Sequence, residues 1–319
     1  MDDTTLKLRM VERLSEVDRA EWDAVANPPG RTFDPFLSWD FLEAMESSHA
    51  AIPETGWTPA HLLVEGVDKT LRAAMPLYAK THSQGEFVFD HNWADAYYRS
   101  GGQYYPKLLS AVPFTPVSGR RLLSAPGADE VHLQRALLAG AVQLAERNEF
   151  SSLHVNFLQP DTAEALKQDG MMIRTDQQFH WQNDGYESFD DFLAALSSAK
   201  RKNLRKERKK AQEGLRFEHL TGDEITEAHW DAFYEFYLDT GQRKWGSPYL
   251  NRETFSILSD RMSEHMLLIL AMDGDRPIAG ALNMIGGGAL FGRYWGCFAR
   301  RHMLHFETCY YQAIDFAIE

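Results

Sequence analysis

The stretch that decides the fold is residues 266–298, which read MLLILAMDGDRPIAGALNMIGGGALFGRYWGCF. Its apolar runs are interrupted twice by turn formers, at Asp273-Gly274-Asp275 and at Gly286-Gly287-Gly288. Turn residues of this kind between short apolar runs are typical of antiparallel hairpins. The sequence therefore predicts a meander of three strands, at Met266–Met272, Pro277–Ile285 and Ala289–Phe298.

The segment after the meander predicts a helix at Phe306–Ile318, which ends with the sequence at Glu319. This helix end carries no capping signal, whereas helices usually end at a glycine or a proline. The first half of the sequence has strands after its own long helix, and the second half has none. We therefore expect the second domain to be truncated at its carboxy terminus in this sequence.

The two halves share an order of two helices, a strand meander and a long helix. In the first half these elements are expected at Ser15–Ala26, Phe36–Met45, His61–Val67, Leu71–Ala79 and Glu130–Arg147. In the second half the two helices are expected at Ile225–Gly241 and Arg252–Met262. The predicted fold class is a mixed α/β protein with an amino-terminal domain at residues 1–175 and a carboxy-terminal domain at residues 176–319.

Shorter elements complete this prediction. Strands are expected at Glu86–Phe89, Ser152–Phe157, Phe179–Gln182 and Leu215–Leu220, a short helix at Thr162–Gln168, and an aromatic and polar loop at Asp90–Gly102.

Composition limits the class of protein. The formal net charge is −13. Hydrophobic residues make up 44% and aromatic residues 12%, and both contents are ordinary for a globular protein. The two cysteines, Cys297 and Cys309, cannot form a disulfide framework or a zinc site of four ligands. The polar start at residues 1–5 shows no secretory signal, and no apolar run reaches the ~20 residues that span a bilayer. We expect a cytoplasmic protein.

One basic run contrasts with this acidic balance. Eight of the eleven residues from Lys200 to Lys210 are lysine or arginine. The run lies within a helix predicted at 189–213, with Ser188 as its amino-terminal cap. One interpretation is a solvated helix face; the other is a phosphate-binding face. Its expected residues are Lys200, Arg201, Lys202 and Arg205.

The last predicted strand carries two glycines, Gly292 and Gly296. Glycine inside a strand indicates a bulge or the close approach of a ligand. The alternative is that both glycines merely let bulky neighbours pack.

Several motifs together make the chain similar to a known family. They are LSSAKRKNLRKE (196–207), FDHNWADAY (89–97), YYPK (104–107), PFTPV (113–117), FYLDT (236–240), GRYWG (292–296), HFE (305–307) and CYYQ (309–312). The chain resembles the FemAB-like peptidoglycan biosynthesis/recognition family, which is related to the Fem aminoacyl transferases.

The resemblance implies two tandem domains of the GNAT acyltransferase fold around a central cleft. In that fold a splayed strand presents a backbone N–H to the acyl oxygen, and the next helix points its amino terminus at a phosphate-bearing donor. The implied function is an N-acyltransferase acting on the amine of a peptide or a cell-wall precursor. The expected donor is acetyl-CoA or another acyl-CoA, or an aminoacyl-tRNA. The start of the last helix, residues 300–307, lacks the glycines of the GNAT pyrophosphate loop, which disfavours coenzyme A.

Acyl transfer needs an oxyanion stabiliser, a base for the amine and an acid for the leaving group. We expect Glu307 as the base, Tyr294 as the acid and Arg293 as a holder of an anionic group, with the three near one another. Further substrate contacts are expected at His91, Trp93, Asp95, Tyr97, Tyr237 and Tyr310. Simpler interpretations are that Glu307 only complements the helix dipole and that the tyrosines only pack. His91 with Asp90 and Asp95 could also hold a metal, and the spacing of His302 and His305 permits zinc. No further ligands cluster near that pair, and we expect no metal.

Two alternatives to an enzyme remain open. The chain could bind a peptidoglycan precursor without chemistry, or it could bind RNA through the basic helix. RNA binding and acyl transfer would be combined in one protein if the donor is an aminoacyl-tRNA.

Overall fold

The meander expected at residues 266–298 is present in the computed structural model, which describes residues 6–243, 246–298 and 301–319. Its strands are β10 (Met266–Asp273), β11 (Arg276–Gly286) and β12 (Ala289–Cys297). A fourth strand, β9 (Arg216–Thr221), pairs with β10, so the sheet order is β12-β11-β10-β9 and every pair is antiparallel. β10 is an inner strand of this sheet, and its residues 266–272 are all buried. A strand buried on both faces has a nearly continuous run of apolar residues.

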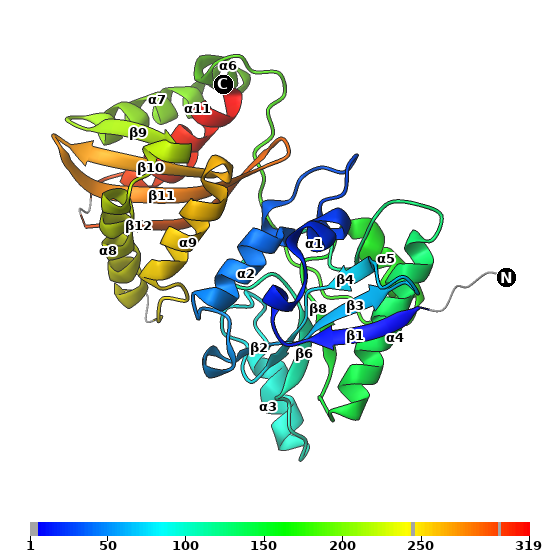
Figure 1. Ribbon diagram of the computed structural model, residues 1–319. Coiled ribbons are helices and arrows are strands. Elements are labelled where there is room, and N and C mark those ends of the chain that lie inside the picture. Colours follow the sequence, from blue (N-terminus) through cyan, green and yellow to red (C-terminus); the bar gives the residue numbers. More distant parts are fainter. Residues whose placement is uncertain (1–5, 244–245, 299–300) are drawn as a thin grey trace. The chain divides into compact units, whose positions relative to one another are not determined.

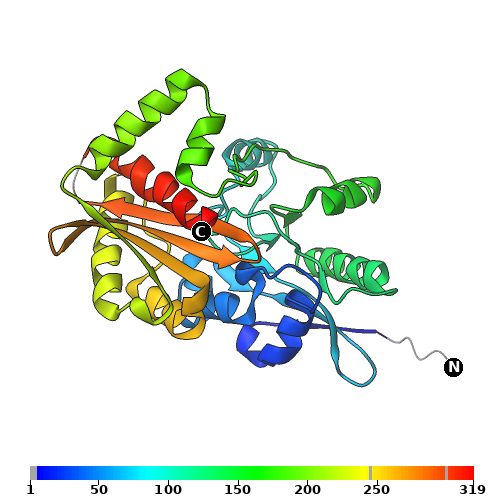
Figure 2. The same cartoon turned by 90° about the horizontal axis from the view of Figure 1, so that it is seen from above.

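Helices cover both faces of this sheet (Figure 2). On one face lie α8 (Glu227–Arg243) and α9 (Arg252–Met262), whose Trp230, Phe233 and Phe255 rings pack on one another. On the other face lies a helix that runs from α10 (Leu304–Phe306) through a π-helical turn (Glu307–Tyr311) into α11 (Gln312–Ile318). The apolar side of this helix packs on Leu267, Ile269 and Ala281.

The chain divides into two compact units, Met1–Thr175 and Asp176–Glu319, and the sheet above belongs to the second (Figure 1). The first unit contains a sheet of the same topology. Its order is β1 (Lys7–Val11), β3 (His61–Glu65), β4 (Leu71–Met75) and β7 (Leu123–Ser124), again all antiparallel. The first unit also has a second sheet, with the order β2 (Trp57–Pro59), β5 (Tyr78–Lys80), β6 (Lys107–Ser110) and β8 (Leu153–Val155).

The helices of the first unit are α1 (Arg19–Ala26), α2 (Trp39–Ser47), α3 (His91–Arg99), α4 (Glu130–Arg147) and α5 (Pro160–Gln168). The apolar side of α4 packs on the first sheet through Leu133, Leu137 and Ala141. Both units therefore have an edge strand, two helices, three antiparallel strands and a helix in that order. The first unit also has β2 before β3, and β5, α3 and β6 between β4 and β7. The predicted repeat of order between the two halves is confirmed at the level of strand topology.

Some sequence predictions are wrong, each for a local reason. The predicted loop at 90–102 contains α3, because Ala94 and Ala96 favour a helix, and its exposed side carries aromatic residues. The predicted strands at Glu86–Phe89 and Phe179–Gln182 are irregular, and Phe87 has a positive φ of 56° that a strand does not allow. The predicted strand at 71–79 is divided into β4 and β5, with Pro76 between them.

The helix predicted at 189–213 consists of two helices, α6 (Phe189–Ala195) and α7 (Ser198–Gln212). Leu196 and Ser197 between them have extended backbone angles, so the chain turns where the sequence pattern is continuous. Ser188 caps α6 by accepting the backbone N–H of Asp191, as predicted. No helix in the described part of the chain is both long and apolar enough to cross a bilayer.

Candidate functional site

The second unit contains a bulge in its edge strand β12. Leu282 of β11 is opposite Tyr294, and the next residue, Asn283, is opposite Gly292, so the register of the ladder shifts at Arg293. Within the described residues β12 pairs with β11 on one side and with no strand on the other. An edge strand presents backbone N–H and C=O groups outside the ladder, and a bulge turns further groups out of it. The bulge predicted from the glycines is therefore present, next to Gly292.

The two glycines of β12 have different roles. A Cβ added to Gly292 would meet its nearest atom, Oδ1 of Asn283, at an ordinary 3.5 Å. A Cβ added to Gly296 would lie 2.2 Å from the backbone oxygen of Phe236 in α8. Gly296 is thus required by the close contact of helix and strand, whereas Gly292 leaves an exposed position beside the bulge.

Tyr294 lies on the α8 face of the sheet, directly after the bulge. Its ring packs edge to face on Tyr237 of α8, with ring centroids 5.3 Å apart. The hydroxyl oxygen of Tyr237 accepts the backbone N–H groups of Tyr249 and Leu250 at 3.0 and 3.2 Å. Burial raises the pKa of both tyrosines, so each hydroxyl keeps its proton at neutral pH. Arg293 lies beside Tyr294, with its guanidinium carbon 5.4 Å from the ring centroid.

Glu307 is fully buried in the π-helical turn. Its Oε1 accepts hydrogen bonds from Arg208 Nε at 3.1 Å, Gln212 Nε2 at 2.8 Å and Gln312 Nε2 at 2.7 Å. Its Oε2 is buried and has no partner within the described residues. Arg208 also binds Asp315 and lies over the Phe189 ring, 3.9 Å from the centroid. Glu307 thus holds α7 against the last helix.

The structure does not bring Glu307 together with Tyr294, contrary to the sequence prediction. Trp295 packs on the face that α11 covers, and its neighbour Tyr294 packs on α8, because side chains alternate between the two faces of a strand. Glu307 binds α7 on the α11 side. Arg293 and Tyr294 are adjacent, and Glu307 lies beyond the sheet from Tyr294.

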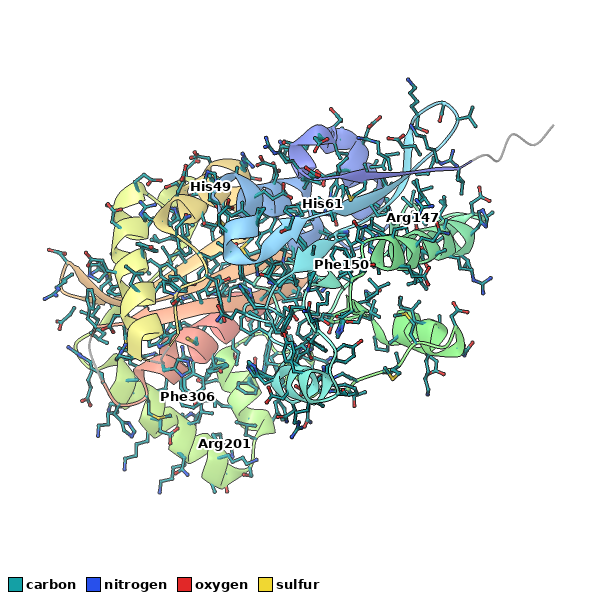
Figure 3. The ribbon with its side chains drawn as sticks, turned by 90° about the horizontal axis from the view of Figure 1, so that it is seen from below. His49, His61, Arg147, Phe150, Arg201 and Phe306 are labelled. Atoms are coloured by element: carbon teal, nitrogen blue, oxygen red, sulfur yellow. The ribbon has the colours of Figure 1, made fainter. Side chains whose placement is uncertain are left out.

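The arginines of α7 point at α6 and the last helix. Arg201, labelled in Figure 3, donates to the carbonyl of Ala194 at 3.0 Å, and Arg205 donates to Asp190 at 2.8 Å. Both side chains were predicted as phosphate ligands, and both have partners on α6. The other two predicted ligands, Lys200 and Lys202, are exposed and make no ion pair with any described residue.

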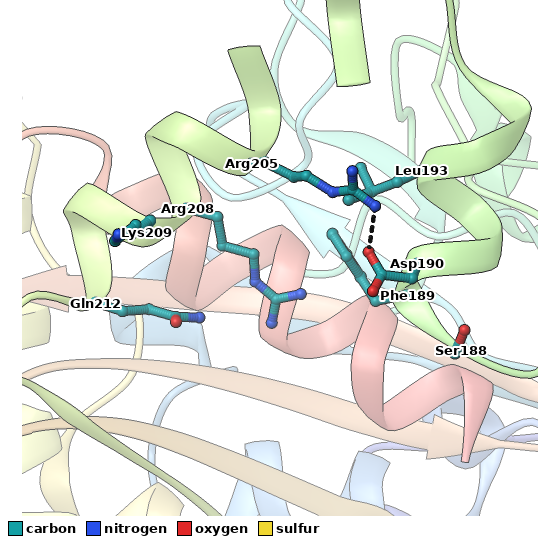
Figure 4. A pocket seen from close by; sticks show the side chains of 8 residues that line it. All are labelled: Ser188, Phe189, Asp190, Leu193, Arg205, Arg208, Lys209 and Gln212. Atoms are coloured by element: carbon teal, nitrogen blue, oxygen red, sulfur yellow. Dashed lines mark hydrogen bonds and ion pairs between the residues drawn. The ribbon is translucent and has the colours of Figure 1, made fainter. Parts of the chain in front are cut away.

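A hollow of about 540 Å³ lies between α6 and α7 (Figure 4). Arg205 spans it to reach Asp190, and Arg208 enters it on the way to the last helix. Its lining residues are Ser188, Phe189, Asp190, Leu193, Arg205, Arg208, Lys209 and Gln212. The arginines in this hollow already meet carboxylates, so the hollow is close to neutral.

The predicted contacts of the first unit lie on or near α3. His91 and Asp95 are exposed, and Trp93 and Tyr97 are 52% and 43% exposed. Tyr97 packs on Tyr104, with centroids 6.0 Å apart. In the second unit Tyr310 is 50% exposed and packs on His305 and Phe306. No group of three or more potential metal ligands occurs among the described residues.

Sequence reasoning missed a buried ionic cluster in the first unit. Lys107 lies fully buried in β6, and its ammonium group donates to Glu86 at 2.7 Å and to Asp90 at 2.5 Å. Arg174 also binds Asp90. Burial acts to raise the pKa of Asp90, but the hydrogen bonds and charges of Lys107 and Arg174 outweigh it and lower this pKa to about 2. The available signal was a lysine in each of two otherwise apolar strands, Lys80 and Lys107.

Lys80 is the second buried lysine of this cluster. Its ammonium nitrogen lies 3.7 Å from the centroid of the Trp57 ring and 3.4 Å from the carbonyl oxygen of Gln84. Burial lowers its pKa to about 7, although the charge of Glu86 acts in the opposite direction. Burial likewise lowers the pKa of the nearby His154 to about 4.

Two consecutive units of similar strand order, with a bulged edge strand leading to a helix in the second, define a tandem α/β protein. The chain belongs to the FemAB-like family, described as peptidoglycan biosynthesis/recognition, which matches residues 13–319.

Several solved structures are similar to this chain at low sequence identity. A tandem GNAT protein from the clavulanic acid biosynthesis pathway is 12% identical, with 98% of this chain and 85% of that chain covered and a TM-score of 0.47. An aminoglycoside 6'-N-acetyltransferase from Acinetobacter baumannii is 11% identical, with 57% and 100% covered and a TM-score of 0.33. A Trypanosoma brucei acetyltransferase is 9% identical, with 56% and 100% covered and a TM-score of 0.32. No curated protein matches this chain.

Proposed function

We propose that this protein is an N-acyltransferase that transfers an acyl or aminoacyl group to an amine of a peptide or a cell-wall precursor. The observation that carries the proposal is the bulge at Arg293 on the outer edge of β12. Backbone N–H groups that leave the ladder there are fixed in place before a substrate arrives. Donors of this kind stabilise the oxyanion of an acyl-transfer intermediate at little reorganisation cost.

Acyl transfer at this edge exchanges one bond and moves one proton. The amine nitrogen attacks the acyl carbon, the new C–N bond forms, and the bond from carbon to the donor's sulfur or oxygen breaks. The nitrogen loses a proton to water, the leaving sulfur or oxygen takes one from Tyr294, and water returns a proton to Tyr294. Tyr294 is our proposed acid for the leaving group, because its raised pKa keeps it protonated. An α-amine has a pKa of about 7.7–8.0, so a useful fraction of the acceptor is neutral near pH 7 without a dedicated base.

The donor in this proposal is an acyl-CoA or an aminoacyl-tRNA, and Arg293 is the group that would hold one of its anionic parts. The acceptor is a peptide or nucleotide-linked muropeptide with a free amine. Trp93, Tyr97 and their neighbours on α3 remain proposed acceptor contacts in the first unit.

The test is a transfer assay with both donors and a muropeptide acceptor, on the wild type and a Gly292→Val variant. Residue 292 is exposed and its Cβ position is unobstructed, so valine should fold but should cover the N–H groups beside the bulge. We expect turnover to fall by about 10²-fold or more. Ala289→Val, also exposed on β12, is the matched control and should change turnover by less than about two-fold.

A binding protein without chemistry is the second candidate, favoured by one observation. Glu307, the residue expected as the base, is buried and held by three donors. Muropeptide binding by calorimetry, without acyl transfer from either donor, would replace the enzyme proposal by this one.

A further inference from the structure

The exposed side of α7 is a line of lysines. At 100° per residue, Lys202, Lys206, Lys209 and Lys210 lie within about 100° of the helix circumference. All four are exposed, and among the described residues none of them has an ion pair. We call these four residues the lysine face. Along the helix axis they span about 12 Å.

Other side chains of α7 hold the helix in one orientation. Arg201 and Arg205 bind α6, Arg208 binds Glu307 and Asp315, and Ala211 is buried. The arginines thus fix the rotation of α7 about its own axis. The four lysines stay exposed, although Lys209 also lines the hollow between α6 and α7. The orientation of the lysine face does not depend on any ligand.

We propose that the lysine face docks the protein on the surface of an anionic phospholipid bilayer. Charge complementarity selects the partner: the four cations of this face project from a chain whose net charge is −13. The acidic excess elsewhere opposes contact of other surfaces with the same bilayer. This proposal is independent of the proposed acyl transfer.

The details of α7 favour a bilayer over a nucleic acid. Residues 198–212 contain no aromatic residue, so the helix offers no platform on which a base could stack. The arginines, which bind phosphates and base edges in a bidentate manner, already have partners on α6 and on the last helix. The lysines stand on the convex side of a helix, which fits a plane, whereas nucleic acids usually follow a positively charged groove.

The docking is electrostatic, without insertion. The exposed side of α7 carries no large apolar residue, and the one leucine of the helix, Leu204, is on the partly buried side. Helices that insert into the interface present a broad apolar side to the acyl chains. Binding through the lysine face should therefore fall steeply with salt.

The test is cosedimentation of the whole protein with vesicles of phosphatidylcholine alone and with about 30% phosphatidylglycerol, at about 50 mM and about 200 mM salt. We expect binding to the anionic vesicles at low salt and none to the neutral ones. Each lysine near an anionic surface strengthens binding about five-fold. The triple variant Lys202→Gln, Lys206→Gln, Lys209→Gln should therefore lower the partition coefficient by about 100-fold.

The matched control is Lys7→Gln, Lys69→Gln, Lys167→Gln, which makes the same change of net charge at exposed lysines of the first unit. It should lower partitioning by less than about two-fold. Equal losses in the two triple variants would overturn the proposal, because general charge would then be responsible. Absence of wild-type binding to anionic vesicles would also overturn it. Binding of a short RNA duplex through these lysines, with no binding to the vesicles, would overturn the proposal as well.

Discussion

At the scale of single residues, the buried hydrogen bonds of Glu307 change the interpretation of a sequence motif. The motif HFE at 305–307 suggested a base at the start of a helix, next to the strand with the glycines. In the fold this carboxylate lies under α7 and accepts from Arg208, Gln212 and Gln312. The geometry favours a structural role, and it separates Glu307 from the edge of β12 where we place the chemistry.

We expect Glu307→Gln to destabilise the protein with little effect on acyl transfer. The amide removes the charge that Arg208 meets at 3.1 Å, and hydrogen bonds to charged groups contribute about 1.5–3 kcal/mol. Urea unfolding should show a loss of that size. Turnover per folded molecule should stay within about two-fold of the wild type. A loss of about 10²-fold in turnover at unchanged stability would return Glu307 to the mechanism.

Lys80 predicts a pH dependence of stability. Its pKa is about 7 in the fold and 10.5 as a model value, so between these values the unfolded chain binds the proton and the folded chain does not. Stability therefore rises as pH increases from about 7 toward 10.5, by at most about 1.4 kcal/mol per pH unit from this group. Lys80→Met should abolish this contribution. Unfolding free energies of both proteins at several pH values check it, and parallel curves would contradict it.

At the scale of elements, the close contact between β12 and α8 depends on the glycine at position 296. Gly296 permits the backbone of α8 to approach the strand, and the ring of Phe236 then packs on Phe298, with centroids 4.9 Å apart. The same helix supplies Tyr237, which packs on Tyr294. The position of the proposed acid therefore depends on a nearby glycine of the same strand.

Gly296→Ala should shift or loosen α8, because its Cβ would lie 2.2 Å from the Phe236 backbone oxygen. Overpacking of this kind costs about 1–3 kcal/mol, and a clash with backbone is hard to relieve. Gly292→Ala meets nothing closer than 3.5 Å and should change stability by less than about 0.5 kcal/mol. Thermal and urea unfolding of the two variants compare them directly, and equal effects would contradict the close contact.

At the scale of the whole molecule, the same strand order occurs twice in one chain. Each unit has its own sheet and its own apolar core, and the cores on the two sheets are built from residues of their own unit. After these strands each unit continues into a helix, α4 in the first and the helix that carries Glu307 in the second. The first unit also has β8, which pairs in parallel with β6. We propose residues 1–175 and 176–319 as the two domains.

The domain proposal predicts that residues 1–175 expressed alone unfold cooperatively. The fragment retains both sheets of the first unit and the cluster of Lys107, Glu86, Asp90 and Arg174. Circular dichroism and calorimetry should give one transition with matching enthalpies. A fragment without a cooperative transition, while the whole chain shows one, would contradict the proposed boundary.

The sequence by itself determined the meander, the repeated order of elements and the basic character of residues 200–210. These features depend on local signals, because turn glycines, apolar periodicity and clustered charge act within a few residues. Only the tertiary structure decided that α6 and α7 are separate, that the arginines of α7 bind α6 and the last helix, and that Tyr294 and Glu307 lie on opposite faces of a sheet. The buried ion pair of Lys107 with Asp90 could not be predicted from the sequence either. These features depend on which surfaces of distant elements meet, and a pattern along one chain does not contain that information.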